Sequence, residues 1–539
     1  MTLTKRYIGH PTLQIALVLV GLLGYHLCLA HGGEPFFNND ESRHTMSSVF
    51  FADVYHDFGQ FLGNPKDYTV RYYCQYPGIG IITWPPLFYA IAGVAMTVFG
   101  PQFWVARACV ALMSAWSCVS VYRLVRLNFS HRLSLLAMVL VALTPLVFVY
   151  SQRVMLEVPC FGFVVAALFR FEHFLMVRDR RSALLAWAWA AAAMLTRFDG
   201  LFILLYFLIR LLHDRSWWVF ARWPVWFGAA VGLGVVVPYY LFTLVVYKEG
   251  LSHSTQAEVS KLGLFAKLWY YPGTIFEQTG PILASVGLAG LCLLKSCPRW
   301  PLTLVASVYL FFAFQSELEP RHVIYWVPAF ALLAVRVVKW LNDRNNPKVA
   351  IGLAVLLIIF GGWVCYWQAY RYVRGFDDAV KWMLEYRTTD RPLMFDGEYS
   401  ASFVFHLRKN DTSRKVWALR GDKLLYSMFS DPSVQYQQKA NNEAEVMQLL
   451  HDADPEMILI EDPPSTFHIV PGSILLWQTL KAHPELYKQE HAVTVDSNYD
   501  RFTNPGTRLV IYRKLHRNPN AKTMSIDVFG LGGSFQPPK

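Results

Sequence analysis

Two adjacent carboxylates, Asp40 and Glu41, follow the first long apolar run of the chain in the stretch FFNNDESRHT. This spacing places two acids close to a predicted membrane surface. A carboxylate in that position can act as a general base, or it can cap the helix predicted to begin at Asp40. The residues alone leave both roles open.

Further ionisable side chains stand between or beside later apolar runs: Arg153 and Glu157 in SQRVMLEVPCFGF, Arg197 and Asp199 in LTRFDGLF, and Glu317, Glu319, Arg321 and His322 in FQSELEPRHVIYWVP. Each group could simply pair with a neighbour, as Arg153 and Glu157 would four residues apart on a helix. An ionisable group inside a span costs roughly 2.5–3.5 kcal/mol, and such groups usually face a functional cavity. Guanidinium groups also bind phosphate oxygens in a forked geometry. The pattern therefore indicates a candidate anion-binding site.

The composition is typical of a membrane protein. Of 539 residues, 54% are hydrophobic and only 16% are charged, against roughly 25% charged in soluble domains. Repeated apolar runs approach the length of about 20 residues that crosses a bilayer as a helix. The net charge of +11 resides mostly in short connections, which indicates orientation charges and not a nucleic-acid interface.

The apolar runs lie near residues 11–30, 84–100, 103–124, 133–150, 158–177, 183–196, 199–212, 224–247, 279–294, 300–316, 323–341 and 349–370. If the run 84–100 stays at the interface, most Lys and Arg residues of the short loops gather on one side. The positive-inside rule makes that side cytoplasmic. We therefore predict eleven spans, a cytoplasmic N-terminus and an extracytoplasmic C-terminus.

The chain after residue 370 changes character. RPLMFDGEYSASFVF, PEMILIED and TRLVIYRKL have strand patterns, whereas DDAVKWMLEY and NNEAEVMQLLHDA have helix patterns. The final GLGGSFQPPK suggests a loosely structured end. We predict a mainly α fold: a polytopic transmembrane bundle of about eleven spans over 1–370, with interfacial juxtamembrane helices in a first extracytoplasmic loop over 31–102. A soluble extracytoplasmic α/β domain follows over 371–539.

From Asp40 onward, apolar residues recur at helical spacing, beginning with Met46, Val49, Phe50 and Val54. Polar residues such as His44 occupy the other faces. This pattern predicts an amphipathic helix that lies on the outer leaflet.

Searches for cofactor motifs give no clear site. The chain contains no phosphate loop, zinc-protease helix or nucleophile elbow, and its cysteines lack metal-ligand or disulfide spacing. Asp40 and His44 could share a helical face as metal ligands, and paired carboxylates near a phosphate could hold a divalent ion. The sequence leaves open whether a divalent metal binds, and it indicates no other cofactor.

Taken in order, these segments resemble the GT-C class of membrane glycosyltransferases, of the protein O-mannosyltransferase and undecaprenyl-phosphate aminoarabinose transferase type. The family pattern is an acidic pair after the first span, a Pro-Pro-Leu segment, an Arg opening the next span, and three later polar breaks. Here these are NNDESRH, TWPPLFYA, Arg107, SQRVMLEVP, LTRFDGLF and EPRHVIYWVP, and the likeness covers about residues 1–370. His44 departs from the Tyr that the family often has, so acceptor contacts are not carried over.

The resemblance implies that the Pro-Pro-Leu segment forms a juxtamembrane helix outside the membrane. It also implies that a sugar moves, with inversion, from a polyprenyl phosphate to a hydroxyl or amine acceptor. Asp40 would be the general base, Glu41 would orient or tune it, and Glu157 would join the catalytic site. The donor phosphate would be held by Arg197 and Arg321, with Arg153 and Arg107 behind them. The loop 248–278 would close over the donor with His253, Glu258 and Lys261.

The implied partners are a polyprenyl-phosphate sugar, a lipid, glycan or protein acceptor, and membrane lipids, without nucleic acid. The lack of a disulfide-rich domain favours a bacterial plasma (inner) membrane. The main alternative is a transporter or flippase for a lipid-linked substrate, whose polar groups would lie near mid-membrane on broken helices. The acids and arginines here cluster at one face, and only the break at Arg197 fits both functions. A scaffold or receptor would need one span as an anchor, so that function leaves the other predicted spans unexplained.

Overall fold

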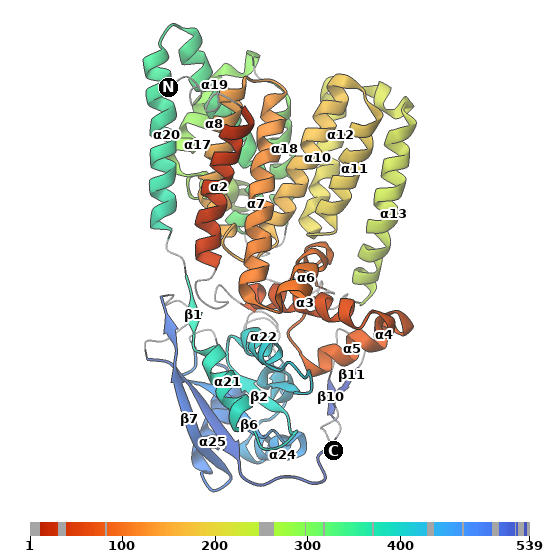
Figure 1. Ribbon diagram of the computed structural model, residues 1–539, viewed down its shortest axis with the longest axis vertical. Helices are drawn as coiled ribbons and strands as arrows, with labels where there is room; N and C mark the ends of the chain where they lie inside the picture. The colour runs from red at the N-terminus through yellow and green to blue at the C-terminus, as the bar shows by residue number, and fades with distance from the viewer. Residues whose placement is uncertain are drawn as a thin grey trace.

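The computed structural model of the 539-residue chain describes residues 11–30, 39–80, 83–246, 263–296, 298–315, 318–368, 371–427, 436–465, 468–498, 506–522, 524–526 and 533–535. It consists of a helical bundle and an α/β domain that lies against one end of the bundle (Figure 1). This end is called the domain-facing end below.

The bundle is built from apolar helices that stand roughly side by side (Figure 1). The longer ones are α2 (Pro11–Ala30), α7 (Phe103–Arg126), α10 (Glu157–Val177), α11 (Arg180–Met194), α12 (Phe202–Asp214), α13 (Trp223–Val246), α18 (Trp300–Phe312), α19 (Val327–Asp343) and α20 (Pro347–Trp367). Shorter ones are α8 (His131–Ala142), α9 (Pro145–Tyr150), α15 (Leu264–Gly273), α16 (Ile275–Thr279) and α17 (Pro281–Gly290), with 3₁₀ turns η1 (Phe198–Leu201), η2 (Trp217–Ala221), η4 (Leu291–Ser296) and η5 (Pro320–Trp326). The predicted polytopic helical bundle is confirmed.

The number of membrane crossings stays a prediction. By length and composition, six helices of the described chain could cross a membrane, or up to seven if the bent pair Leu264–Thr279 and Pro281–Leu293 counts as one span. Every predicted span corresponds to helix, but several are short or broken. Proline explains two of the breaks, because Pro145 and Pro281 each begin a new helix.

The run 84–100 forms α6 (Leu87–Phe99), which lies at the domain-facing end of the bundle (Figure 1). It packs against α3 (Asn39–His56), the helix that begins with the acidic pair. A Cβ atom on Gly93 would lie 2.7 Å from Cβ of Phe51, so this glycine allows the two helices to approach closely.

The amphipathic prediction for α3 is wrong in one respect. Polar residues of α3 are buried as fully as its apolar ones, including Glu41, His44 and Ser47. The reason is that α3 is covered on one side by α6 and on another by α22 (Ser400–Asn410) of the α/β domain. The helix is therefore an internal element between the two halves of the molecule. Two short helices, α4 (Phe58–Gly63) and α5 (Pro65–Gln75), continue the chain beside it.

The α/β domain is organised around a five-stranded sheet in the order β3-β2-β6-β9-β7. Its strands are β2 (Leu393–Asp396), β3 (Ala418–Arg420), β6 (Met457–Asp462), β7 (Tyr487–Thr494) and β9 (Arg508–Lys514). The first three are parallel, with Leu393 opposite both Ala418 and Met457, whereas β9 runs antiparallel to β6 and β7. Short pairs flank the sheet: β1 (Val373–Arg374) with β8 (Asp496–Ser497), and β4 (Tyr426–Ser427) with β5 (Gln437–Gln438).

Helices cover both faces of this sheet, which explains the nearly continuous apolar runs of its strands. Leu459 and Ile511 belong to the core on the side of α21 (Phe376–Tyr386) and α22. Ile458 and Val510 alternate with them and belong to the core on the side of α24 (Glu443–Ala453) and α25 (Pro471–Ala482). The α/β class predicted for the tail is confirmed.

One local prediction for the tail is wrong, and another can be followed only in part. SASFVF belongs to helix α22 and not to a strand, because the helix is buried on nearly all sides and its sequence shows no polar face. Of the final segment GLGGSFQPPK only residues 533–535 are described; they form β11 (Gly533–Phe535), which pairs antiparallel with β10 (Met524–Ile526) and lies against α5. The rest of that prediction lies outside the described residues. The remaining helix of the domain is α23 (Gly421–Leu424).

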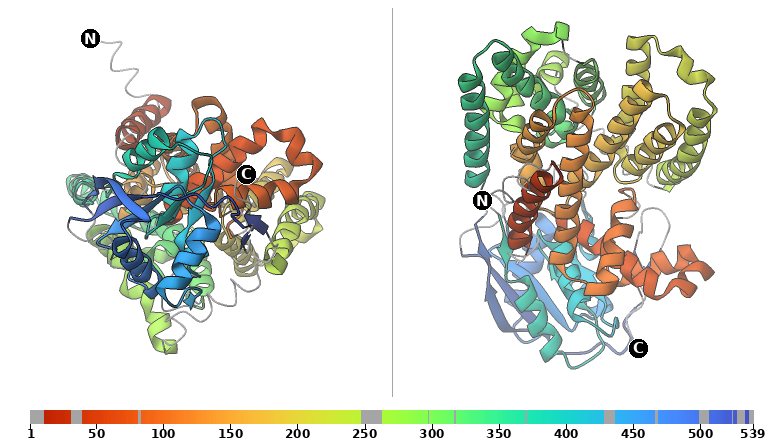
Figure 2. Two further views of the ribbon diagram at one scale, coloured as in Figure 1. Left: turned by 90° about the horizontal axis from the view of Figure 1, so that it is seen from below. Right: turned by 45° about the horizontal axis from the view of Figure 1, so that its top comes forward.

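Charged pairs join the α/β domain to the first loop of the bundle. Arg408 on α22 binds Asp53 on α3, with 2.8 Å between Nε and Oδ2. Arg414, after α22, makes a forked contact with Asp57 at 2.7 and 3.0 Å. Seen from below, the domain covers much of this end of the bundle, with the orange helices α4 and α5 beside it (Figure 2).

Candidate active site

The two adjacent acids at the start of α3 have different surroundings. The Asp40 side chain is 25% exposed, and its Oδ1 lies 3.8 Å from Nη1 of Arg43. The Glu41 side chain is completely buried. Successive side chains on a helix point about 100° apart, so neighbours in sequence can meet different environments. Only Asp40 is open to a substrate from solvent.

Glu41 anchors α3 to the bundle. Its Oε1 accepts a hydrogen bond from the backbone N–H of Val154 at 3.0 Å and lies 3.5 Å from Nη2 of Arg107. Arg107 sits in the first turns of α7, is 1% exposed, and lies over the Phe103 ring at 4.2 Å. The structure therefore brings Arg107 to Glu41, inside the protein.

The α/β domain also holds the start of α3. The side chain of Asn39 donates a hydrogen bond to the backbone carbonyl of Glu398 and accepts one from the N–H of Ala401 at 3.1 Å. An asparagine can make both bonds because its amide carries a donor and an acceptor. These contacts fix the residue directly before Asp40.

A second cluster forms around Glu157 at the first residue of α10. Its Oε1 is hydrogen-bonded by Nη1 of Arg197 and lies 3.5 Å from Nε of Arg321. Arg197 also binds Asp199, and Arg321 also binds Glu319. Three segments far apart in sequence thus converge on one carboxylate that is 1% exposed.

Arg153 and Glu157 are not arranged as the helical pair, four residues apart, that their spacing allowed. α10 begins only at Glu157, so Arg153 and Glu157 do not lie on one helix. Arg153 is buried and lies over the Tyr150 ring at 5.8 Å. Its location beside Arg107 still leaves it at the domain-facing end of the bundle.

Gly200 follows the Arg197 break and is needed for close packing. A Cβ atom there would lie 2.6 Å from the carbonyl carbon of Ala193. The chain can therefore fold back tightly between α11 and α12, which places Arg197 over Glu157.

His44, one turn after Asp40 on α3, is buried against the Pro-Pro-Leu segment and α6. Its Nδ1 is hydrogen-bonded to the Tyr89 hydroxyl of α6 at 2.7 Å, and its ring meets the Trp84 ring at a centroid distance of 4.7 Å. Burial lowers the pKa of His44 to about 4, so the imidazole is neutral at physiological pH. Asp40 and Glu157 act in the opposite direction, which shows that both acids lie within electrostatic reach of one ring.

Part of the predicted site lies outside the described residues. This holds for Glu317 and for the substrate-loop residues His253, Glu258 and Lys261. Within the described chain, no group of three or more His, Cys, Asp or Glu residues could hold a metal ion. The described acids of the predicted site, Asp40, Glu41, Glu157, Asp199 and Glu319, each form an ion pair with an arginine.

Sequence reasoning missed the groups that position the predicted residues. The contacts of Asn39 with Glu398 and of Glu41 with Val154 join residues more than 100 positions apart, and no local pattern signals them. Tyr89 was visible only as part of the Pro-Pro-Leu segment. Its hydroxyl gives buried His44 a partner, which explains why a polar residue is tolerated there.

Comparison with known proteins agrees with the resemblance. Residues 83–242 match the family model described as dolichyl-phosphate-mannose-protein mannosyltransferase. This range contains TWPPLFYA, Arg107, SQRVMLEVP and LTRFDGLF, but not the acidic pair. No curated protein matches the sequence significantly.

The fold is similar to that of solved structures of ArnT. ArnT from Cupriavidus metallidurans bound to undecaprenyl phosphate superimposes with a TM-score of 0.57 at 14% identity, covering 92% of this chain and 97% of that one. Its apo structure gives 0.56 with the same identity and coverage. Archaeal oligosaccharyltransferase AglB from Archaeoglobus fulgidus gives 0.48 at 11% identity, covering 91% and 75%. The predicted resemblance to the GT-C class is confirmed by the family match and the ArnT-like fold.

Proposed function

We propose that this protein is a membrane glycosyltransferase that moves a sugar from a polyprenyl phosphate to a hydroxyl or amine acceptor. The proposal rests chiefly on the convergence of Arg197 and Arg321 on buried Glu157, at the bundle end where Asp40 is exposed. The family match and the ArnT-like fold support it, as does the undecaprenyl phosphate bound to that ArnT.

In this mechanism Asp40 accepts the proton of the acceptor O–H or N–H as the bond to the anomeric carbon forms. The bond between that carbon and the phosphate oxygen breaks on the opposite side, so the configuration inverts. The electron pair leaves on the polyprenyl phosphate. Asp40 suits the role of base because it is the accessible member of the acidic pair.

Arg197 and Arg321 would stabilise the departing phosphate. One guanidinium about 4 Å from a phosphate charge is worth up to about 4 kcal/mol at an effective dielectric near 20. Glu157 would hold both guanidinium groups at the spacing that a phosphate needs. Its Oε2 has no hydrogen-bond partner among the described residues, so the cluster is not closed on itself.

The remaining residues have supporting roles in the proposal. Glu41 would position Asp40 by anchoring α3, and Arg107 would serve Glu41 before any phosphate. Arg153 would add positive charge behind the donor site. His253, Glu258 and Lys261 would contact the donor from the loop 248–278, and a divalent metal is not required by these steps.

The orientation follows from the same argument. A polyprenyl tail must stay in the bilayer while its sugar reaches water, so the domain-facing end of the bundle would lie at the extracytoplasmic surface. The N-terminus would be cytoplasmic and the α/β domain extracytoplasmic, in a bacterial inner membrane. Transport is less favoured, because the Glu157 cluster lies at helix ends and not midway along the helices.

A direct assay would incubate the purified protein with a panel of polyprenyl-phosphate sugars and candidate acceptors and measure release of polyprenyl phosphate. We expect turnover of at least one donor. Replacement of Asp40 by Asn should lower kcat by about 100-fold to 10,000-fold, the usual contribution of a general base. Absence of turnover with every donor would contradict the enzyme assignment.

The matched control is Asp67→Asn, an identical change at an exposed position on α5 of the same loop. It should leave kcat unchanged. If Asp40→Asn turns the donor over with an unchanged kcat, Asp40 is not the base. Thermal unfolding of both variants in detergent would show that the fold is retained.

A further inference from the structure

The carboxyl ends of β2 and β6 lie where the connections of the sheet change direction. From β2 the chain passes through α22 to β3 on one side, whereas β6 pairs with β2 on the other side. In open α/β sheets, ligands usually bind in the crevice at such a switch point. Here the side chain of Asn39, from the first residue of α3, bonds to the backbone directly after β2. The switch point therefore holds a part of the protein itself.

Asn39 caps a helix of the α/β domain from a distance. The N–H of Ala401 belongs to the first turn of α22, where backbone N–H groups have no partner within the helix. Tyr399, the residue before α22, supplies no side-chain cap. Oδ1 of Asn39 accepts the Ala401 N–H at 3.1 Å, although the two residues are 362 positions apart. The starts of α3 and α22 are thus tied to each other.

The second partner of Asn39, the carbonyl of Glu398, is held from behind by the sheet. The N–H of Glu398 donates to Oε1 of Glu461 at 3.1 Å, and the N–H of Ser465 donates to Oε2 of the same carboxylate at 3.3 Å. Glu461 is buried on β6, which pairs with strands on both sides. A chain of hydrogen bonds therefore runs from a central strand of the domain through Glu398 to Asn39.

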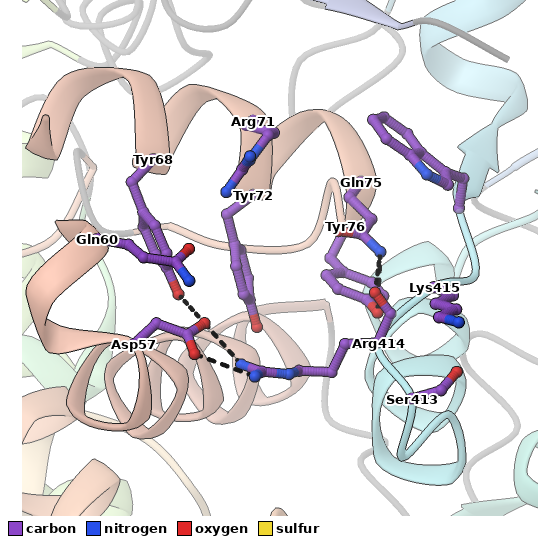
Figure 3. A pocket seen from close by; sticks show the side chains of 11 residues that line it. Asp57, Gln60, Tyr68, Arg71, Tyr72, Gln75, Tyr76, Ser413, Arg414 and Lys415 are labelled. Carbon is purple, nitrogen blue, oxygen red and sulfur yellow. Dashed lines mark hydrogen bonds and ion pairs between the residues drawn. The ribbon is translucent and has the colours of Figure 1, made fainter. Parts of the chain in front are cut away.

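A separate attachment joins the domain to the other end of α3. Figure 3 shows the forked contact of Arg414 with Asp57 and the bond from Gln75 to the Arg414 carbonyl, which is 2.8 Å long. Asp57 follows Asp40 by 17 residues, so a rise of 1.5 Å per residue places it about 25 Å away. The Arg414 contact can therefore dock the domain without setting the position of Asp40.

We infer that Asn39 is a positioning residue for the reaction, through which the α/β domain sets the direction of the Asp40 carboxylate. This inference rests on the proposed function, because it takes Asp40 as the base. A carbonyl requires a donor and an N–H requires an acceptor, so the Asn39 amide fits its two partners in one orientation only. The backbone directly before Asp40 is thereby fixed. Precise placement matters because an error of about 1 Å can cost about 100-fold in rate.

The first test is Asn39→Ala in the full-length protein, which removes both bonds and leaves Asp40 in place. We expect kcat for release of polyprenyl phosphate to fall by about 10-fold to 100-fold. The KM for the donor should stay unchanged, because the Glu157 cluster is not altered. Asn64→Ala, the same change at the N-cap of α5 in the same loop, should leave kcat unchanged. An unchanged kcat in Asn39→Ala would overturn the inference.

A double variant shows whether Asn39 acts through Asp40. Added to Asp40→Asn, the Asn39→Ala change should lower kcat by less than about twofold further, because residues that act as a unit are not additive. A further loss as large as in the wild type would assign Asn39 to the fold in general and overturn the positioning role. A normal kcat in Asp40→Asn alone would instead remove the base of the proposed function.

Hydrogen exchange in detergent tests the inference without turnover. In Asn39→Ala the backbone amides in the first two turns of α3 should exchange faster than in the wild type, while those of β6 stay protected. Arg414→Ala, which breaks the attachment at the other end, should leave the start of α3 unchanged. Unchanged exchange at the start of α3 in Asn39→Ala would overturn the inference. Faster exchange in β6 as well would also overturn it, since Asn39 would then maintain the whole domain.

Discussion

Helix α10 carries two buried glutamates that each bind arginine, and their surroundings differ. Glu157 lies at its first residue, at the domain-facing end of the bundle, and Glu172 lies 15 residues later, about 22 Å along the helix axis. Both are nearly inaccessible to solvent, at 1% and 5% exposure. The two glutamates therefore share residue type and helix and are almost equally buried, so the difference between them lies in their partners.

The Glu172 cluster is closed. Arg210 on α12 makes a forked contact with both carboxylate oxygens at 2.8 and 3.0 Å, and the Tyr206 hydroxyl donates to Oε1 at 2.6 Å. Arg210 also binds Asp214, which accepts from Arg299 at 2.6 Å. Every oxygen of Glu172 is thus used by the protein itself.

The Glu157 cluster, in contrast, leaves one carboxylate oxygen without a partner in the described chain, and it is called open for that reason. Both arginines approach a single oxygen, and Oε2 has no hydrogen-bond partner among the described residues. Native proteins rarely leave a buried polar atom in that state unless a ligand or function requires it. Glu41 Oε2 also lacks a partner among the described residues, so an unsatisfied oxygen is not peculiar to Glu157. What distinguishes the Glu157 cluster from the Glu172 cluster is the convergence of two arginines on one oxygen.

The largest expected effect is on stability at the closed cluster. Glu172→Gln should lower the free energy of unfolding by about 3 kcal/mol or more, since it leaves buried Arg210 without its forked partner. The matching Glu157→Gln should cost less, because its contacts are less complete. Thermal unfolding of both proteins in detergent measures this, and equal losses would remove the distinction between the clusters.

The second largest expected effect is a loss of turnover when an arginine of the Glu157 cluster is replaced. Arg321→Gln should lower kcat by about 100-fold to 1,000-fold, as loss of one preorganised charge-stabilising donor commonly does. Arg210→Gln should leave kcat of the folded protein unchanged while reducing its melting temperature. The assay is release of polyprenyl phosphate. A loss of turnover in Arg210→Gln without unfolding would show that both clusters take part in the reaction.

A smaller effect should distinguish Glu41 from its neighbour. Glu41→Gln should reduce stability by about 1–3 kcal/mol, because a buried arginine loses its charged acceptor over a contact of 3.5 Å. It should lower kcat far less than Asp40→Asn. If the two variants lose kcat equally, Glu41 acts in the chemistry as well as in the position of α3.

The smallest effect is a pH dependence in the α/β domain. Burial lowers the pKa of His468, but Asp396, with its Oδ1 at 3.7 Å, and the charges of Glu461 and Glu398 raise it from 6.5 to about 9. The native state therefore keeps a proton that the unfolded state releases. This stabilisation is fully present below pH 6.5 and is lost as the pH rises through 9.

One variant tests whether this pH dependence of stability arises from His468. Burial raises the pKa of Glu461 to about 7, so its own contribution to stability is lost between pH 4.5 and 7. Hydrogen bonds to Glu443 and Glu485 also raise the pKa of His483 from 6.5, so the share of His468 is the part of the decline between pH 7 and 9 that His468→Gln removes. Unfolding temperatures measured across this range would contradict the assignment if the variant keeps the original slope.

Much of the candidate site could be predicted from the sequence. Asp40, Glu157, Arg197 and Arg321 were selected because charged residues interrupt apolar runs, and that signal depends only on local composition. The resemblance to the GT-C class used the order of the same segments. The ion pair between Arg210 and Glu172, in contrast, was not predicted; α12 continues to Asp214 and buries Arg210 against Glu172. Its partner lies 38 residues away, beyond any local pattern.

The sequence by itself determined the apolar helices, the α/β character of the tail and the places where charge enters the bundle. These properties follow from side-chain chemistry and from spacing along a single element. Only the tertiary structure decided which acid of the pair is exposed, which arginines share a carboxylate, and how α22 and Asn39 hold the start of α3. Such outcomes depend on contacts between residues far apart in the chain, where burial and hydrogen-bond partners are set by packing and not by neighbours in sequence.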